Sequence, residues 1–86
     1  MHEMSVALEV CRIAEDCVGL ESLPWVREIG VLVGRRSGVE PESLRFCLET
    51  LLGSEPFRGA RASLELTPGD ELRVDYLEVD DERPTN

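Results

Sequence analysis

The first part of the chain distributes apolar and polar residues with the period of an amphipathic helix. From Met4 to about Val18, polar side chains recur at helical spacing and leave a broad apolar face. The polar stripe consists of Ser5, Glu9, Arg12 and Asp16. Gly19 follows at a favourable position for ending a helix. The pattern therefore predicts a helix over residues 4–18 and a connector over residues 20–24.

The next segment, residues 25–34, has the period of a strand. Ile29, Val31 and Val33 alternate on one face, and the opposite face is also apolar because it carries Leu32. Strands with two apolar faces are usually covered on both sides. We therefore expect this strand to be covered, or nearly so, on both faces.

A second helix is predicted from Pro41 to about Leu52. Proline suits the first helical position, and the neighbouring Glu40 and Glu42 favour the positive end of the helix dipole. The core-facing stripe consists of Leu44, Cys47, Leu48, Leu51 and Leu52. Phe46 lies off that stripe, which leaves it as either a second core contact or an anchor for a partner.

Two further strands are predicted over residues 60–66 and 71–79. The second changes the phase of its alternation, and this change predicts a β-bulge near Asp75 and Tyr76. Between them, Thr67-Pro68-Gly69-Asp70 has proline and glycine at type II turn positions. We therefore expect the two strands to form an antiparallel hairpin.

The element order predicts an α+β fold with two helices packed on a three-stranded mixed sheet, in the order helix-strand-helix-strand-strand. The first two strands should be parallel, joined by a right-handed crossover. The expected core consists of Leu8, Cys11, Val31, Val33, Leu44, Leu48, Leu51, Leu64 and Val74. Residues 1–79 should form one domain, and residues 80–86 a flexible acidic tail.

Composition narrows the possible partners. The chain has 86 residues and a formal charge of −9, and all of its basic residues are arginine. Such acidity disfavours nucleic acid and anionic lipid and suits a basic protein surface or a cation. The cysteines Cys11, Cys17 and Cys47 lie in apolar stripes without C-x-x-C spacing, which predicts buried thiols in a reducing compartment. No segment is long and apolar enough for a membrane span, so we expect a cytoplasmic protein.

The strongest candidate chemistry lies at Met1-His2-Glu3. His2 is the only histidine in the sequence and follows the α-amine by one residue. The terminal amine, the deprotonated His2 amide and the imidazole Nδ1 can chelate one metal ion, and planar nitrogen donors suit Ni(II) or Cu(II). The fourth donor is open: the Glu3 amide, its carboxylate, a water or a partner residue could provide it. Taken alone, these three residues are more typical of an exposed terminus than of a metal site.

Motifs along nearly the whole chain resemble the HypA/HybF family of nickel chaperones for NiFe-hydrogenase maturation. The matching segments are Met1-His2-Glu3-Met4-Ser5, the V-x-x-I-x-V-x-V-G strand from Val26 to Gly34, Ser37-Gly38-Val39-Glu40-Pro41-Glu42 with Leu44-Arg45-Phe46, Gly59-Ala60, and Gly69-Asp70-Glu71-Leu72-Arg73-Val74 with Leu77-Glu78-Val79. They occur in order and at family-like spacing between residues 1 and 79.

The resemblance implies a non-enzymatic metallochaperone. Met1 and His2 would supply nickel ligands, and Glu3 would support the site. The implied partners are the maturation GTPase of the hydrogenase pathway and the hydrogenase large subunit, with urease as the recipient in some organisms. A homodimer is a further option.

One departure from the family is large. Its members carry a zinc module with two C-x-x-C pairs where this chain has only Thr67-Pro68-Gly69-Asp70, and no cysteine follows Cys47. We therefore expect no zinc site. The alternative function is a paralogue or truncated fragment that keeps the fold as a protein-interaction module without metal delivery. An enzyme is the least favoured class, because no nucleophile–base pair stands out.

Overall fold

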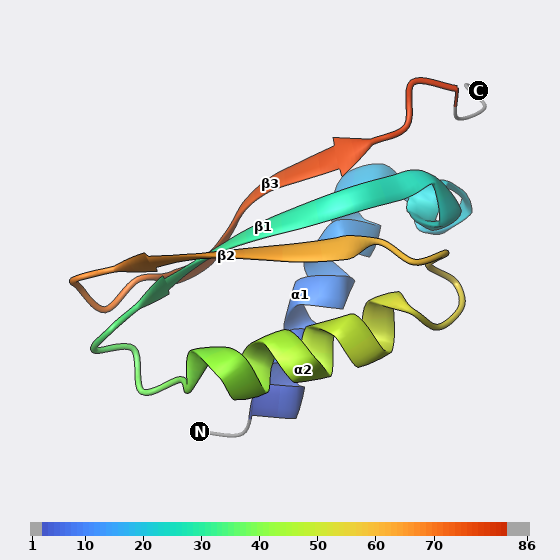
Figure 1. Ribbon diagram of the computed structural model, residues 1–86. Helices are drawn as coiled ribbons and strands as arrows, with labels where there is room; N and C mark the ends of the chain where they lie inside the picture. The colour runs from blue at the N-terminus through green and yellow to red at the C-terminus, as the bar shows by residue number, and fades with distance from the viewer. Residues whose placement is uncertain (1–2, 83–86) are drawn as a thin grey trace.

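The structure is a computed structural model that describes residues 3–82 (Figure 1). Its elements are α1 (Glu3–Val18), the 3₁₀-helix η1 (Leu20–Trp25), β1 (Val26–Gly34), α2 (Pro41–Leu52), β2 (Arg61–Thr67) and β3 (Leu72–Val79). The two α-helices lie together on one side of a three-stranded sheet. The predicted α+β class and element order are confirmed, whereas Trp25 belongs to η1 and not to the strand.

The sheet has the order β2-β1-β3, with β1 parallel to β2 and antiparallel to β3. The prediction of a mixed sheet with parallel first and second strands is confirmed. The predicted hairpin of β2 with β3 is wrong, because β1 lies between them. β1 carries the most continuous run of apolar residues, so the central position gives it two neighbours and buries it best.

The connection over residues 68–71 reaches from β2 to β3 across the end of β1. It is held by backbone hydrogen bonds: the Gly34 N–H donates to the Glu71 carbonyl (2.6 Å) and the Arg36 N–H to the Gly69 carbonyl (2.9 Å). A Cβ atom at Gly34 would lie only 2.2 Å from the Gly69 carbonyl oxygen. The short connection can therefore cross here only because residue 34 has no side chain.

The predicted bulge in β3 is confirmed. Gly30 faces Tyr76 and the next residue, Val31, faces Val74, so Asp75 is an extra residue on β3. This insertion explains the change of phase in the sequence, because it returns Leu77 to the same face as Val74.

In residues 3–82, helices cover only one face of the sheet (Figure 1). The opposite face of β1 is nearly covered, as predicted, because Gly30 and Gly34 are buried and Leu32 is half-buried. On the opposite face, the ring of Tyr76 lies over Gly30, where an added Cβ would be 2.1 Å from Tyr76 Cε2. The Tyr76 hydroxyl donates to the Glu28 carboxylate, and this contact raises the pKa of the tyrosine. A single aromatic side chain thus replaces a second layer over the middle of β1.

The core lies between the sheet and the helices. Its buried residues on the three central elements are Ala7, Val10 and Ala14 of α1, Ile29, Val31 and Val33 of β1, and Leu44, Leu48 and Leu52 of α2. The predicted core members Cys11, Leu51, Leu64 and Val74 are partly buried and pack against this cluster.

Two predictions of burial are wrong. Leu8 is 54% exposed and Cys17 is exposed. Leu8 lies two residues from the buried Val10, which places it about 160° away around the helix axis. The apolar face of α1 is broader than the part that the sheet and α2 can cover.

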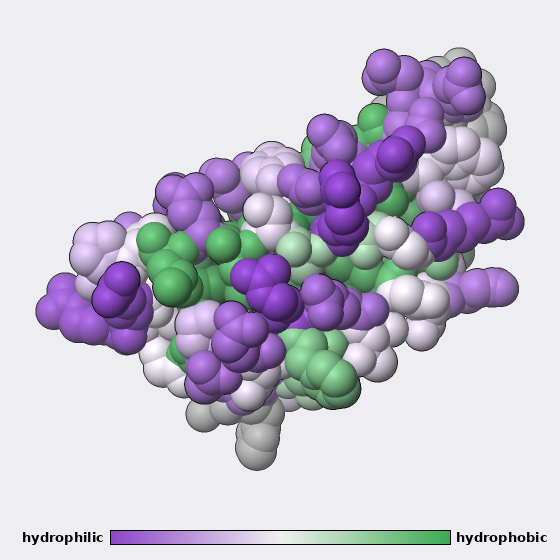
Figure 2. All heavy atoms as spheres, in the orientation of Figure 1, coloured by the Kyte–Doolittle hydropathy of each residue, from purple (hydrophilic) through white to green (hydrophobic). Residues whose placement is uncertain are grey.

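Hydrophilic side chains cover most of the face drawn in Figure 2, and hydrophobic residues reach the surface in a few places. Among residues 3–82, Phe46 is the most exposed large hydrophobic residue, at 70%, so the interpretation of Phe46 as a core contact is excluded. Gly19 ends α1 with a φ of 86°, and Gly53 ends α2, both as predicted.

Candidate metal site

Of the three predicted metal-site residues, the structure describes only Glu3. Met1 and His2 lie outside the described residues 3–82. Glu3 is the first residue of α1. The structure therefore shows how the residue after His2 is held, and leaves the metal ligation by Met1 and His2 as a prediction.

Glu3 contacts the start of the second helix. Its Oε2 accepts a hydrogen bond of 3.0 Å from the backbone N–H of Glu40, the N-cap residue of α2. This N–H is one of the donors that a helix start leaves without an intrahelical partner, and a carboxylate is a favourable acceptor for it. The contact fixes residue 3 against α2, directly after the predicted ligands.

The side chain of Glu40 completes this corner. Its Oε1 accepts from the Ser43 N–H at 2.8 Å and so caps α2. The hydrogen bonds from Ser43, with a weaker one from the Glu42 N–H, lower the pKa of Glu40, while the nearby charge of Glu3 opposes the shift. The carboxylates of Glu3 and Glu40 therefore lie close together where both helices begin. Glu3 accepts from the Glu40 N–H and Glu40 accepts from the Ser43 N–H.

Sequence reasoning missed the contribution of Glu40 to this corner. The sequence predicts that Glu40, before Pro41, favours the positive end of the helix dipole, and the structure confirms Glu40 at the start of α2. The contact with Glu3 spans 37 positions in the sequence. No local pattern reports a contact of that range.

The rest of the described chain offers no second metal site. Within residues 3–82, no group of three or more His, Cys, Asp or Glu side chains is arranged to hold a metal ion. Burial raises the pKa of Cys11, which disfavours the thiolate that a metal would need. Cys17 lies exposed and Cys47 half-buried on other parts of the two helices.

The short connection between β2 and β3, where we expect no zinc site, is closed by its own hydrogen bonds. Thr67 Oγ1 donates to Glu71 Oε1 at 2.7 Å, and this hydrogen bond lowers the pKa of Glu71. The connection also accepts hydrogen bonds from the N–H groups of Gly34, at the end of β1, and of Arg36 just after it. It is a closed turn built from oxygen and nitrogen groups, without a sulfur donor.

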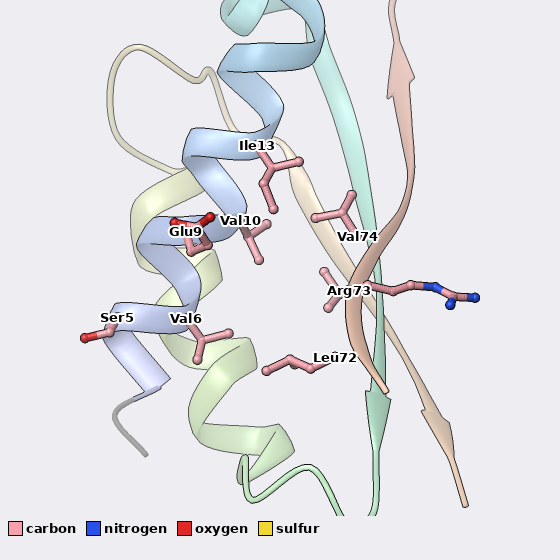
Figure 3. Close-up of a pocket in the computed structure, with 9 residues that line it drawn as sticks. Ser5, Val6, Glu9, Val10, Ile13, Leu72, Arg73 and Val74 are labelled. Carbon is pink, nitrogen blue, oxygen red and sulfur yellow. The ribbon is translucent and has the colours of Figure 1, made fainter. Parts of the chain in front are cut away.

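A separate concave feature lies between α1 and β3. It is an apolar groove of about 280 Å³, lined chiefly by Val6, Val10, Ile13, Leu72 and Val74 (Figure 3). Sequence reasoning did not find it, because it depends on β3 being an edge strand. No helix within residues 3–82 is long and apolar enough to cross a membrane.

Comparison with known proteins gives a consistent result. The family described as hydrogenase/urease nickel incorporation, metallochaperone, hypA matches residues 1–72. The chain is similar to the hydrogenase maturation factor HypA of Dechloromonas aromatica, with 38% identity over 69 residues, covering 80% of this chain and 61% of that protein. It is similar to that of Geobacter sp., with 41% identity over 70 residues, covering 80% and 60%. For the Chlorobium limicola protein the identity is 34% over 65 residues, covering 76% and 56%. The chain thus spans roughly three fifths of the length of the curated relatives that it matches.

Proposed function

This chain belongs to the HypA family of hydrogenase and urease nickel-incorporation metallochaperones, and from that membership we propose that it binds Ni(II) at Met1-His2-Glu3 and passes the ion to a partner protein. The observation that carries the proposal is the extent of the family match. It begins at residue 1 and so includes the only histidine in the chain.

The donor set suits the cargo. The Met1 amine, the His2 amide nitrogen and the His2 imidazole are three nitrogen donors on adjacent residues, and Ni(II) accepts such donors in a plane. Glu3 supports the site, because its carboxylate holds the start of α1 against the Glu40 N–H. The fourth donor is a water, an atom of Glu3 or a residue of the partner.

Family membership also suggests the partners. We propose the maturation GTPase of the hydrogenase pathway and the hydrogenase large subunit as the proteins that meet this chain, with urease as an alternative recipient. The protein acts in the cytoplasm and carries its metal without catalysing a reaction. It holds no zinc, because the cysteine pairs of the family's zinc module are absent from its sequence.

The test is calorimetric titration with Ni(II). We expect the native chain to bind about one equivalent, and His2→Ala to lose tight binding because no other imidazole is present. Cys17→Ala is the matched control, since it removes an exposed potential ligand elsewhere and should leave the affinity unchanged. Unchanged affinity in His2→Ala would refute the nickel site.

A chain extended by a few residues before Met1 provides a second test. The extension converts the Met1 amine into an amide and should abolish tight binding while circular dichroism shows a normal fold. Binding also releases protons from the donors, so the affinity of the unextended chain should rise from about pH 6 to about pH 8. Equal nickel binding by the extended chain would assign the metal to carboxylates instead.

The second candidate function is docking without metal delivery. It is favoured by the exposure of Phe46, which projects from α2 with 70% of its surface accessible. A docking module would keep partner binding in His2→Ala and lose it in Phe46→Ala. A nickel carrier would lose metal transfer in His2→Ala and keep it in Phe46→Ala.

A further inference from the structure

The groove between α1 and β3 has a buried floor and open walls. Val10 and Val31 form its floor and are 5% and 1% exposed. Val6 and Ile13 on one side, and Val74 on the other, are half-buried. Covering half-buried apolar side chains with another apolar group lowers the free energy, because it removes their surface from water.

The groove borders the backbone of an edge strand. In the sheet formed by residues 3–82, β3 pairs with β1 on one side only. Leu72 and Val74 point toward α1, whereas the side chain of Arg73 between them points away (Figure 3). Arg73 therefore meets the groove with its backbone, and within residues 3–82 no strand pairs with the outer edge of β3 beside the groove.

The position of the bulge limits where a strand can be added. Asp75 interrupts the regular pairing of β3, and bulges of this kind protect strand edges. The preceding part, from Leu72 to Val74, is regular and is the part that lines the groove. The other edge strand, β2, lies over α2 (Figure 1).

The surroundings favour a basic occupant. α1 carries Glu9, Glu15 and Asp16 on its exposed surface against the single base Arg12. Glu9 lies on the rim of the groove, and its hydrogen bond with Arg12 lowers its pKa and keeps it ionised. The whole chain has a formal charge of −9. A segment rich in arginine or lysine is attracted to this surface, whereas a second copy of the chain is repelled.

We propose that an extended basic segment of a partner protein pairs with β3 at Leu72–Val74 and places apolar side chains in the groove beside α1. In a strand, alternate residues point to the same face, so every second side chain would enter. The groove volume of about 280 Å³ is nearly twice the ~150 Å³ that accommodates a benzene ring, which gives room for about two apolar side chains. This docking does not depend on nickel, and none of the residues that line the groove is a proposed nickel ligand.

The probe is a capped hexapeptide of alternating arginine and valine, added to the full ¹⁵N-labelled chain without metal. We expect chemical-shift changes concentrated at Val6, Ile13 and residues 72–74. A peptide N-methylated at alternate residues should bind at least about tenfold more weakly, because it cannot pair its backbone with β3. Comparable affinity for the two peptides, or shifts confined to β2 or α2, would overturn the proposal.

Two variants on the same helix locate the site. Ile13→Arg places a charge in the groove and should weaken peptide binding by about tenfold or more, whereas Leu8→Arg changes an exposed residue on the other side of α1 and should have little effect. The N-methylated peptide keeps the test valid if Ile13→Arg does not fold.

The remaining outcomes are also decisive. The absence of any shift at millimolar peptide overturns the proposal. A concentration-dependent dimer that Ile13→Arg converts to a monomer overturns it in favour of a second copy. Repeating the titration with His2→Ala separates this result from the nickel proposal, because peptide binding should be unchanged in that variant.

Discussion

At the scale of single residues, two contacts join segments that are distant in the sequence. The Glu3 carboxylate holds the start of α1 to the start of α2 through the Glu40 N–H. At Gly34, the absence of a side chain allows the connection between β2 and β3 to cross β1. Each contact leads to a measurable consequence.

Gly34→Ala should lower the free energy of unfolding by about 2 kcal/mol or more, because its Cβ would collide with the Gly69 carbonyl oxygen. Urea denaturation measures the loss. Gly30→Ala is the matched comparison on the same strand: its Cβ meets the ring of Tyr76, a side chain that can rotate away, so its loss should be smaller. An equal or larger loss in Gly30→Ala would contradict this ranking of the two contacts.

Glu40 should make stability depend on acid pH. Its hydrogen bonds with Ser43 lower its pKa in the folded chain from 4.5, so its contribution is present above that value and is lost as the pH falls through the lowered one. Thermal unfolding followed from about pH 6 to about pH 3 should show a steeper fall for the native chain than for Glu40→Gln. Parallel curves for the two chains would contradict this role.

At the scale of elements, α2 separates its two faces sharply. Leu48 is fully buried against the sheet, and Phe46, two residues earlier, is 70% exposed. Leu48→Ala should therefore cost about 2–5 kcal/mol of stability in chemical denaturation. Phe46→Ala is the control in the same helix and should cost well under ~1 kcal/mol. A loss below about 0.5 kcal/mol in Leu48→Ala would mean that α2 packs by another face.

The helices and the bulge could be predicted from sequence because each has a local cause. Residues 41–52 combine a proline at the first position with a single apolar stripe, and Asp75 shifts a strict alternation by one residue. The pairing of β2 and β3 was predicted wrongly, because a turn motif indicates a short connection but does not determine which strands pair. The strand order depends on β1, whose apolar side chains favour the central position, and on Gly34, whose lack of a side chain lets the connection cross the end of β1.

The site could be predicted only in part for a similar reason. Met1-His2-Glu3 is a chelating sequence whatever the fold, so its chemistry is visible in the residues alone. Glu40 and the groove beside Ile13 depend on how distant elements pack. Leu8 shows the same limit for the core: helical spacing identified an apolar face, but not how much of it would be covered.

At the scale of the whole molecule, the fold should be independent of zinc. The helices and sheet share one apolar core, and within residues 3–82 no three or more His, Cys, Asp or Glu side chains are grouped so that they could hold a metal ion. We expect the purified protein to contain less than about 0.1 zinc per chain and to keep its thermal midpoint in excess EDTA. Loss of the helical circular dichroism signal on adding EDTA would contradict this expectation, and restoration by Zn(II) alone would identify the ion.

The central position of β1 also has a consequence for synthesis on the ribosome. β1 is the first strand to emerge, yet both of its neighbours, β2 and β3, come from residues 61–79. Until those residues leave the ribosome, α1 and α2 can cover one face of β1 while both of its edges stay open. The strand with the most continuous run of apolar residues thus keeps both edges open until residues 61–79 have emerged, and the sheet can be completed only after that point.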